Sequence, residues 1–228
     1  MSEYPHIYPF KRKKAAEAGE IAVRSGEECF LIPWELICLL VCAVLLARAQ
    51  LLGSLYPFGA AILTAAAVYY KHSIPWFFLA LAAGSFLAMQ GTEIILYLAV
   101  YAVLSLLLFF YQADGLKQWI VLPCLAASVM LVATLTGGGS YLFMAGVFEA
   151  LFAGGLTLVF LVFFQAMRRF ESVRRFSIDE TICFFIIAAG VICGLSGWQV
   201  SGITLQDVAG RLLILAAAFL GGPGAGAA

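Results

Sequence analysis

The run IILYLAVYAVLSLLLFFY at residues 94–111 decides the fold class of this chain. Its apolar residues follow one another without a break longer than one position, and they do not alternate with polar ones. A helix needs about 20 mostly apolar residues to cross the hydrocarbon core of a bilayer. Strands of a membrane β-barrel alternate apolar and polar residues, so the run predicts a transmembrane helix.

Similar apolar segments lie on both sides of this run, at 31–50, 51–70, 74–91, 119–136, 141–167, 181–197 and 208–222. Apolar residues make up 64% of the 228 positions and charged residues 11%. A soluble domain has about half and about a quarter respectively. We therefore predict an all-α, polytopic membrane bundle of about eight spans over residues 31–228, with the last span incomplete. Residues 1–30 are predicted to form a basic, cytoplasmic N-terminal tail.

The first two segments are separated only by a predicted turn around Gly53-Ser54, and Pro57 suits the first turn of the second helix. Ala47-Arg48-Ala49 resembles a signal-peptidase site, which makes cleavage after the first segment an alternative. The polar region before that segment is long, and the segment itself is longer than the apolar part of a signal peptide. We therefore interpret the first segment as a retained span.

The distribution of lysine and arginine predicts the orientation of the spans. With the N-terminus in the cytoplasm, the tail holds five of the thirteen basic residues and the inner loops hold six. The predicted outer connections, near 51–54, 92–93, 137–140 and 198–207, hold none. We therefore predict a multi-pass protein of the cell membrane with a cytoplasmic N-terminus.

Two glycine-rich motifs suggest chemistry that the rest of the chain does not support. Gly194-Leu195-Ser196-Gly197 has the GxSG pattern of rhomboid intramembrane proteases, but no histidine follows His72 to act as a base. Gly137-Gly138-Gly139-Ser140 lacks the Lys-Ser/Thr ending of a phosphate-binding loop. The pattern Gly190-x-x-x-Gly194 has two open interpretations, which are close helix packing and simple helix termination.

Cofactor and nucleic-acid partners also have little support in the sequence. The six cysteines form no CxxC pair, and the chain has only two histidines. The net charge of zero gives no general attraction to nucleic acid. We expect no catalytic residue, no cofactor, no metal site and no nucleic-acid partner in this chain.

Three charged residues, Arg48, Glu149 and Arg211, lie inside apolar segments at positions predicted to be in the outer half of the membrane. Charges at such a depth are costly, so they usually face the bundle interior and form pairs. We predict a structural charge pair between Glu149 and Arg48, with Arg211 as the second choice. Snorkelling to the outer interface and a role in transport or proton relay remain alternatives.

Several motifs in the chain are similar to one known family. They are FSIDETICF at 176–184, Gly194-Leu195-Ser196-Gly197, Arg211 with the apolar run into Gly221-Gly222, Ala47-Arg48-Ala49 with Pro57-Phe58-Gly59, and Glu149-Ala150. From about residue 36 to its end, the chain resembles the N-terminal membrane region of the stage II sporulation protein E family of endospore-forming bacteria.

The resemblance implies a polytopic membrane region followed by a cytoplasmic self-association region and a metal-dependent serine phosphatase domain. That phosphatase, with manganese or magnesium, dephosphorylates an anti-anti-sigma factor and so frees the forespore sigma factor. The family also implies a location at the polar division septum and an interaction with the tubulin-like division protein.

This chain departs from the family pattern because the phosphatase needs a cluster of metal-binding aspartates. Its three aspartates, Asp114, Asp179 and Asp207, are scattered at loops and span edges. We expect no enzymatic activity from the chain, and we expect it to be a membrane portion separated from its enzyme or a gene cut short.

The predicted function is therefore to anchor and localise a stage II sporulation protein E-like phosphatase. The lipid bilayer is the expected partner, and a homo-oligomer remains open. The alternative function is a small transporter or channel, which would need Arg48, Glu149 and Arg211 to line a water-filled cavity. An intramembrane enzyme is the third hypothesis, and it lacks a complete catalytic set.

Overall fold

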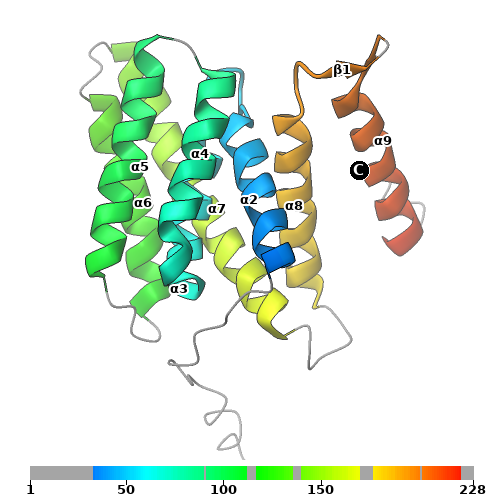
Figure 1. Ribbon diagram of the computed structural model, residues 1–228, viewed down its shortest axis with the longest axis horizontal. Helices are drawn as coiled ribbons and strands as arrows, with labels where there is room; N and C mark the ends of the chain where they lie inside the picture. The colour runs from blue at the N-terminus through cyan, green and yellow to red at the C-terminus, as the bar shows by residue number, and fades with distance from the viewer. Residues whose placement is uncertain are drawn as a thin grey trace, which may run out of the picture.

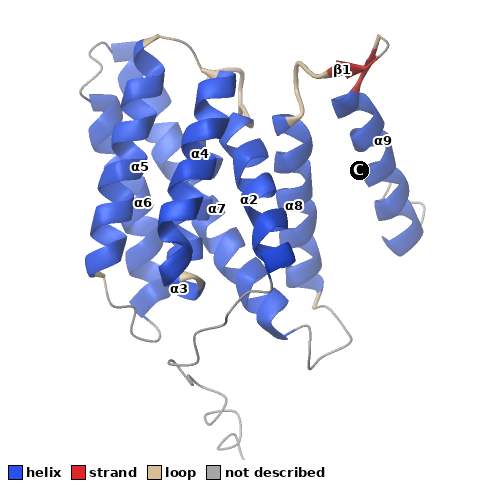
Figure 2. Cartoon of the chain, in the orientation of Figure 1, coloured by secondary structure: helices blue, strands red, loops and turns tan. Residues whose placement is uncertain are grey.

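The computed structural model describes residues 33–89, 91–111, 117–135, 140–169, 177–200 and 202–221. The described residues form a bundle of helices, which confirms the predicted all-α class (Figures 1 and 2). The elements are α2 (Pro33–Arg48), α3 (Pro57–Tyr69), η1 (Lys71–Ser73), α4 (Ile74–Ala88), α5 (Thr92–Phe110), α6 (Gln118–Leu135), α7 (Ser140–Arg169), α8 (Ile178–Gly194), β1 (Gln199–Val200), β2 (Ile203–Thr204) and α9 (Leu205–Gly221).

The length and composition of the helices indicate a membrane protein. Among the described residues, three helical stretches are long and apolar enough to cross a bilayer, namely Glu93–Phe110, Gln118–Leu135 and Phe143–Arg168. Helix α3 is apolar but shorter. Each α-helix overlaps one of the predicted apolar segments, and three of them meet this stricter test. The predicted N-terminal tail, the basic pair Arg174 and Arg175, and the Gly137–Gly139 run lie outside the described residues.

The outward faces of the bundle are apolar. Ile95 and Ile120 are each 70% exposed, and Phe110 is 75% exposed. Large exposed apolar patches make a protein associate in water, whereas hydrocarbon solvates them well. The distribution of side chains is therefore typical of a bundle that is surrounded by lipid.

Helix α3 occupies the centre of the bundle. Its residues 57–67 are all buried, and it packs against α7, α5, α6 and α4. Many of these residues are alanine, which allows neighbouring helix backbones to come close. Because a 13-residue helix is only about 20 Å long, α3 is shorter than the hydrocarbon core that it would cross.

A tight turn connects α2 to α3 where the sequence predicts one. The backbone N–H of Leu51 donates to the carbonyl of Leu55 at 2.8 Å, and Gly53 has a φ of 81°. Left-handed backbone is easily adopted by glycine, which explains its position in the turn. The turn occupies residues 51–55, so the helix of the predicted 51–70 segment begins only at Pro57.

Helices α8 and α9 form the edge of the bundle. The backbone N–H of Ser177 donates to Glu180 Oε2 at 2.8 Å, and this cap starts α8 three residues before the predicted apolar segment. Strands β1 and β2 pair as a short antiparallel hairpin, with Gln199 opposite Thr204. The hairpin carries the chain to α9, which packs against α8 and lies at the right-hand edge of Figure 1.

Candidate functional site

Glu149 on α7 is buried and lies where three helices meet. It is 3% exposed, and its Oε1 accepts hydrogen bonds from the backbone N–H of Tyr56, at 2.9 Å, and from the hydroxyl of Tyr97. Tyr56 is the N-cap of α3, and Tyr97 lies on α5. The first N–H groups of a helix have no partner within the helix, and its N-terminus favours negative charge. Glu149 therefore caps α3 from a neighbouring helix and ties it to α5.

Tyrosine side chains surround this carboxylate. The Tyr56 and Tyr97 rings meet edge to face with centroids 5.5 Å apart, and the Tyr97 and Tyr101 ring centroids are 6.5 Å apart. The Tyr56 hydroxyl accepts a hydrogen bond from Gln50 Nε2. A Cβ at Gly59 would contact the Tyr101 hydroxyl, so glycine at that position makes room for the ring. These residues form a polar layer inside an otherwise apolar bundle, which we call the Glu149 layer.

Arg48, at the end of α2, has a different set of partners. It is 8% exposed, its Nη2 donates to the carbonyl of Ser196 at 3.1 Å, and its guanidinium carbon lies 5.0 Å from the centre of the Trp198 ring. Ser196 follows the C-terminus of α8, where carbonyl groups lack partners and positive charge is favoured. Arg48 therefore holds the end of α8 and the start of the connection to α9.

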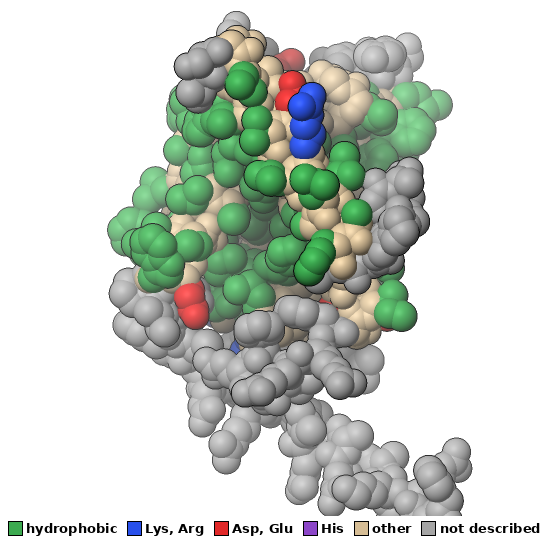
Figure 3. Space-filling view, turned by 90° about the vertical axis from the view of Figure 1, so that its right-hand side faces the viewer, with side chains coloured by type: hydrophobic (Ala, Val, Ile, Leu, Met, Phe, Trp, Pro, Cys, Tyr) green, Lys and Arg blue, Asp and Glu red, His purple; other side chains and the backbone are tan. Residues whose placement is uncertain are grey.

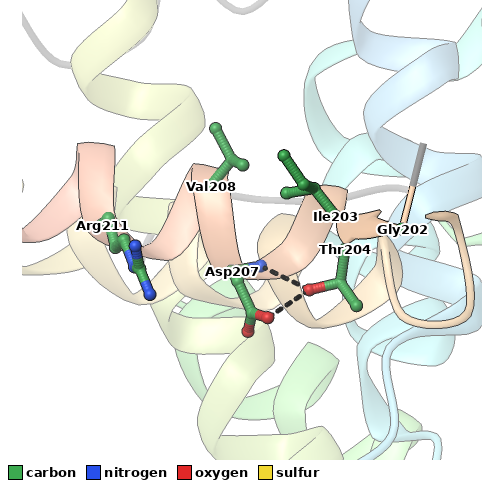
Figure 4. Close-up of a pocket in the computed structure, with 6 residues that line it drawn as sticks. All are labelled: Gly202, Ile203, Thr204, Asp207, Val208 and Arg211. Atoms are coloured by element: carbon green, nitrogen blue, oxygen red, sulfur yellow. Dashed lines mark hydrogen bonds between the residues drawn. The ribbon is translucent and has the colours of Figure 1, made fainter. Parts of the chain in front are cut away.

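Arg211 lies apart from both of these groups. It is exposed on α9 and lines a cavity of about 310 Å³ with Gly202, Ile203, Thr204, Asp207 and Val208 (Figure 4). The Thr204 hydroxyl donates to Asp207 Oδ2, and the Asp207 N–H donates back to Thr204 Oγ1 at 3.3 Å. This exchange caps the N-terminus of α9.

The predicted charge pair is not formed among the residues that the structure describes. Glu149 accepts hydrogen bonds from an amide and a phenol, Arg48 contacts a carbonyl and an indole ring, and Arg211 is exposed. The structure therefore corrects the expected pairing of Glu149 with Arg48 or Arg211. The physical reason is that each buried charge lies next to neutral dipoles of its own, an amide and a phenol for Glu149 and a carbonyl for Arg48.

Sequence reasoning missed the partners Tyr56, Tyr97, Ser196 and Trp198. Tyrosine fits an apolar run as well as leucine does, so its hydroxyl gave no separate signal. Trp198 lies in a predicted outer connection, and nothing in that segment indicated a contact with Arg48. The position of Tyr56 directly before Pro57, at a predicted helix start, was the one usable clue to a backbone N–H that needs a partner.

The glycines of the Gly190-x-x-x-Gly194 pattern lie in close contact with neighbouring helices. A Cβ at Gly194 would meet the backbone of Leu45 on α2, and one at Gly190 would meet the side chains of Phe58 and Leu46. Small residues at such positions let two helices approach closely in a membrane. The structure thus shows close packing of α8 at both glycines, although helix α8 also ends at Gly194.

Comparisons with known proteins agree with the sequence resemblance. The family model described as "SpoIIE, N-terminal domain" matches residues 5–228. The curated protein "Stage II sporulation protein E" of Bacillus subtilis (strain 168) is 30% identical over 87 residues, which are 38% of this chain and 10% of that protein. The aligned part thus spans a tenth of the relative's length. No solved structure matches the chain.

Proposed function

Because this chain belongs to the SpoIIE N-terminal domain family, we propose that it is the membrane anchor of a stage II sporulation protein E-like phosphatase. In this proposal the chain inserts as a bundle of about eight spans with its N-terminus in the cytoplasm. It holds the phosphatase at the membrane of the polar division septum, where activation of the forespore sigma factor takes place.

The main support for the proposal is that the family match covers nearly the whole chain, and that this chain forms a bundle with apolar outward faces. Residues 5–228 include every described helix. A membrane-type bundle with a sporulation relative supports a role in which the membrane itself is the main partner.

The Glu149 layer has a structural role in this proposal. Its carboxylate joins α7, α3 and α5 by hydrogen bonds, and Arg48 joins α2 to the end of α8. Hydrogen bonds between buried polar groups on different helices fix the relative positions of those helices in an apolar surrounding. We propose that neither site is catalytic, and that the chain alone does not hydrolyse phosphoserine with manganese or magnesium.

The rival hypothesis of a small transporter required Arg48, Glu149 and Arg211 to line one cavity. The structure places these residues in three different surroundings, and only Arg211 lines the cavity at the start of α9. We therefore prefer the anchor.

Fluorescence microscopy in sporulating cells of an endospore-forming bacterium tests the proposed function. The chain is fused at its N-terminus to a fluorescent protein, and an unrelated polytopic membrane domain with the same reporter serves as the control. We expect the fusion to resist carbonate extraction and to concentrate at the polar septum, while the control spreads evenly. Extraction by carbonate would contradict the anchor, and an even distribution would contradict the septal location.

A further inference from the structure

The outer end of α9 presents two opposite charges next to each other. Asp207 and Arg211 are both exposed and lie four residues apart, so their side chains leave the same face of the helix. Figure 4 shows both side chains on one side of α9, with Val208 and Ile203 on the other. The two are not within ion-pair distance of each other in the described structure, and both line the cavity of about 310 Å³.

The same face of α9 becomes apolar along the helix. Leu215 and Phe219 continue the four-residue spacing of Asp207 and Arg211, and they are 65% and 90% exposed. Side chains spaced by four residues form one row that winds slowly around the helix. The stripe therefore runs from a charged pair at the predicted membrane surface to apolar side chains at greater depth.

The surrounding surface has the same character. Figure 3 shows the side of the molecule around α9 as largely hydrophobic, with basic and acidic side chains next to each other near the top. The Thr204 hydroxyl donates a hydrogen bond to one oxygen of the Asp207 carboxylate, and this bond fixes the orientation of the carboxylate. The arrangement is thus a charged pair of defined geometry above an exposed apolar stripe.

We propose that the stripe of Asp207, Arg211, Leu215 and Phe219 binds a phospholipid with a primary ammonium in its headgroup, phosphatidylethanolamine. Arg211 binds the phosphate, Asp207 accepts hydrogen bonds from the ammonium, and the acyl chains lie along Leu215 and Phe219. This inference rests on the proposed membrane insertion of the chain.

The charge pattern selects this lipid over other occupants. A guanidinium binds any phospholipid phosphate, so Arg211 gives affinity without selectivity. The choline headgroup has no N–H to donate to Asp207, and the neutral glycerol of phosphatidylglycerol brings no positive charge to the carboxylate. A second copy of α9 in antiparallel contact would also satisfy the charges, and dimerisation without lipid selectivity would reveal it.

Native mass spectrometry of the purified full chain in detergent tests the proposal by lipid titration. Phosphatidylethanolamine should bind about threefold to tenfold more tightly than phosphatidylcholine or phosphatidylglycerol, which is the scale of one surface charge pair. Asp207→Asn should remove most of the preference over phosphatidylcholine, because a neutral amide has no charge to attract the ammonium. Arg211→Gln should weaken the binding of all three lipids.

Asp179→Asn is the matched control, because Asp179 is an exposed carboxylate in the first turn of another apolar helix, α8. It should keep the preference. Thr204 still caps α9, and the amide oxygen of asparagine can accept a hydrogen bond from its hydroxyl, so Asp207→Asn should fold, as circular dichroism will check. Equal binding of the three lipids, a preference that survives Asp207→Asn, or dimerisation without lipid selectivity would overturn the proposal. Membrane insertion is tested separately by the carbonate extraction of the fluorescent fusion, so a failure of the anchor is distinguished from the loss of this lipid site.

Discussion

Helices α3 and α9 are both apolar, yet they are stabilised in different ways. Residues 57–67 of α3 are buried by protein, whereas α9 exposes Leu212, Leu215 and Phe219 and contacts mainly α8. The interior of the bundle thus depends on packing between helices, whereas its edge exposes apolar side chains. Hydropathy alone therefore does not tell which apolar helix forms the core.

The largest expected difference between the two helices comes from matched leucine truncations. Leu63 on α3 is fully buried, and Leu212 on α9 is 62% exposed. Leu63→Ala should lower the free energy of unfolding by about 2–5 kcal/mol, because it leaves a cavity. Leu212→Ala should change it by less than about 0.5 kcal/mol. Unfolding in mixed micelles, titrated with a denaturing detergent and followed by tryptophan fluorescence, measures both.

Similar losses at both leucines would contradict the assignment of α3 to the core. A larger loss at Leu212 would indicate that α9 is covered by protein and not by lipid.

Matched glycine-to-alanine substitutions in α8 and α9 should give a smaller difference in the free energy of unfolding. The two effects can have opposite signs. A Cβ at Gly194 would meet the Leu45 backbone, while Gly210 on α9 has nothing within 4 Å of its Cβ position. Gly194→Ala should cost about 1–3 kcal/mol, because α8 must move away from α2. Gly210→Ala should be neutral or should stabilise the chain by up to about 1 kcal/mol, because alanine favours helix.

The same micelle titration measures the two glycine variants, with their helix content checked by circular dichroism. If Gly194→Ala were tolerated as well as Gly210→Ala, the close contact between α8 and α2 would be wrong.

The smallest expected effect is a coupling energy within the Glu149 layer. A double-mutant cycle of Glu149→Gln and Tyr97→Phe should give a coupling of about 1 kcal/mol, because the two side chains share a hydrogen bond. The cycle of Glu149→Gln with Arg48→Gln should give a coupling near zero, because those residues have separate partners. A strong coupling between Glu149 and Arg48, with no coupling between Glu149 and Tyr97, would contradict the described contacts and would support the ion pair predicted from the sequence.

The helical class and most helix positions could be predicted from the sequence, because long apolar runs leave few other structures in lipid. Gly53 and Pro57 also marked the turn and the start of α3 correctly. The burial of Arg48 and Glu149 was predictable from the cost of charge in hydrocarbon.

Their partners were not predictable, because a buried charge can be satisfied by dipoles as well as by an opposite charge. Tyr97 is 52 positions from Glu149, and no periodicity connects them. The central place of α3 was also hidden, because its hydropathy resembles that of its neighbours. Helix order along the chain does not fix which helix lies in the middle of a bundle.

We propose that the chain spans the membrane with its N-terminus inside, and the two ends of the short helix α3 provide the sharpest test of this orientation. Ser54 and Lys71 are exposed and flank α3. In a background without the native cysteines, Ser54→Cys and Lys71→Cys are treated with a membrane-impermeant thiol reagent on intact cells. We expect labelling of Ser54→Cys from outside and labelling of Lys71→Cys only after permeabilisation. Labelling of both from the same side, or the reverse pattern, would contradict it.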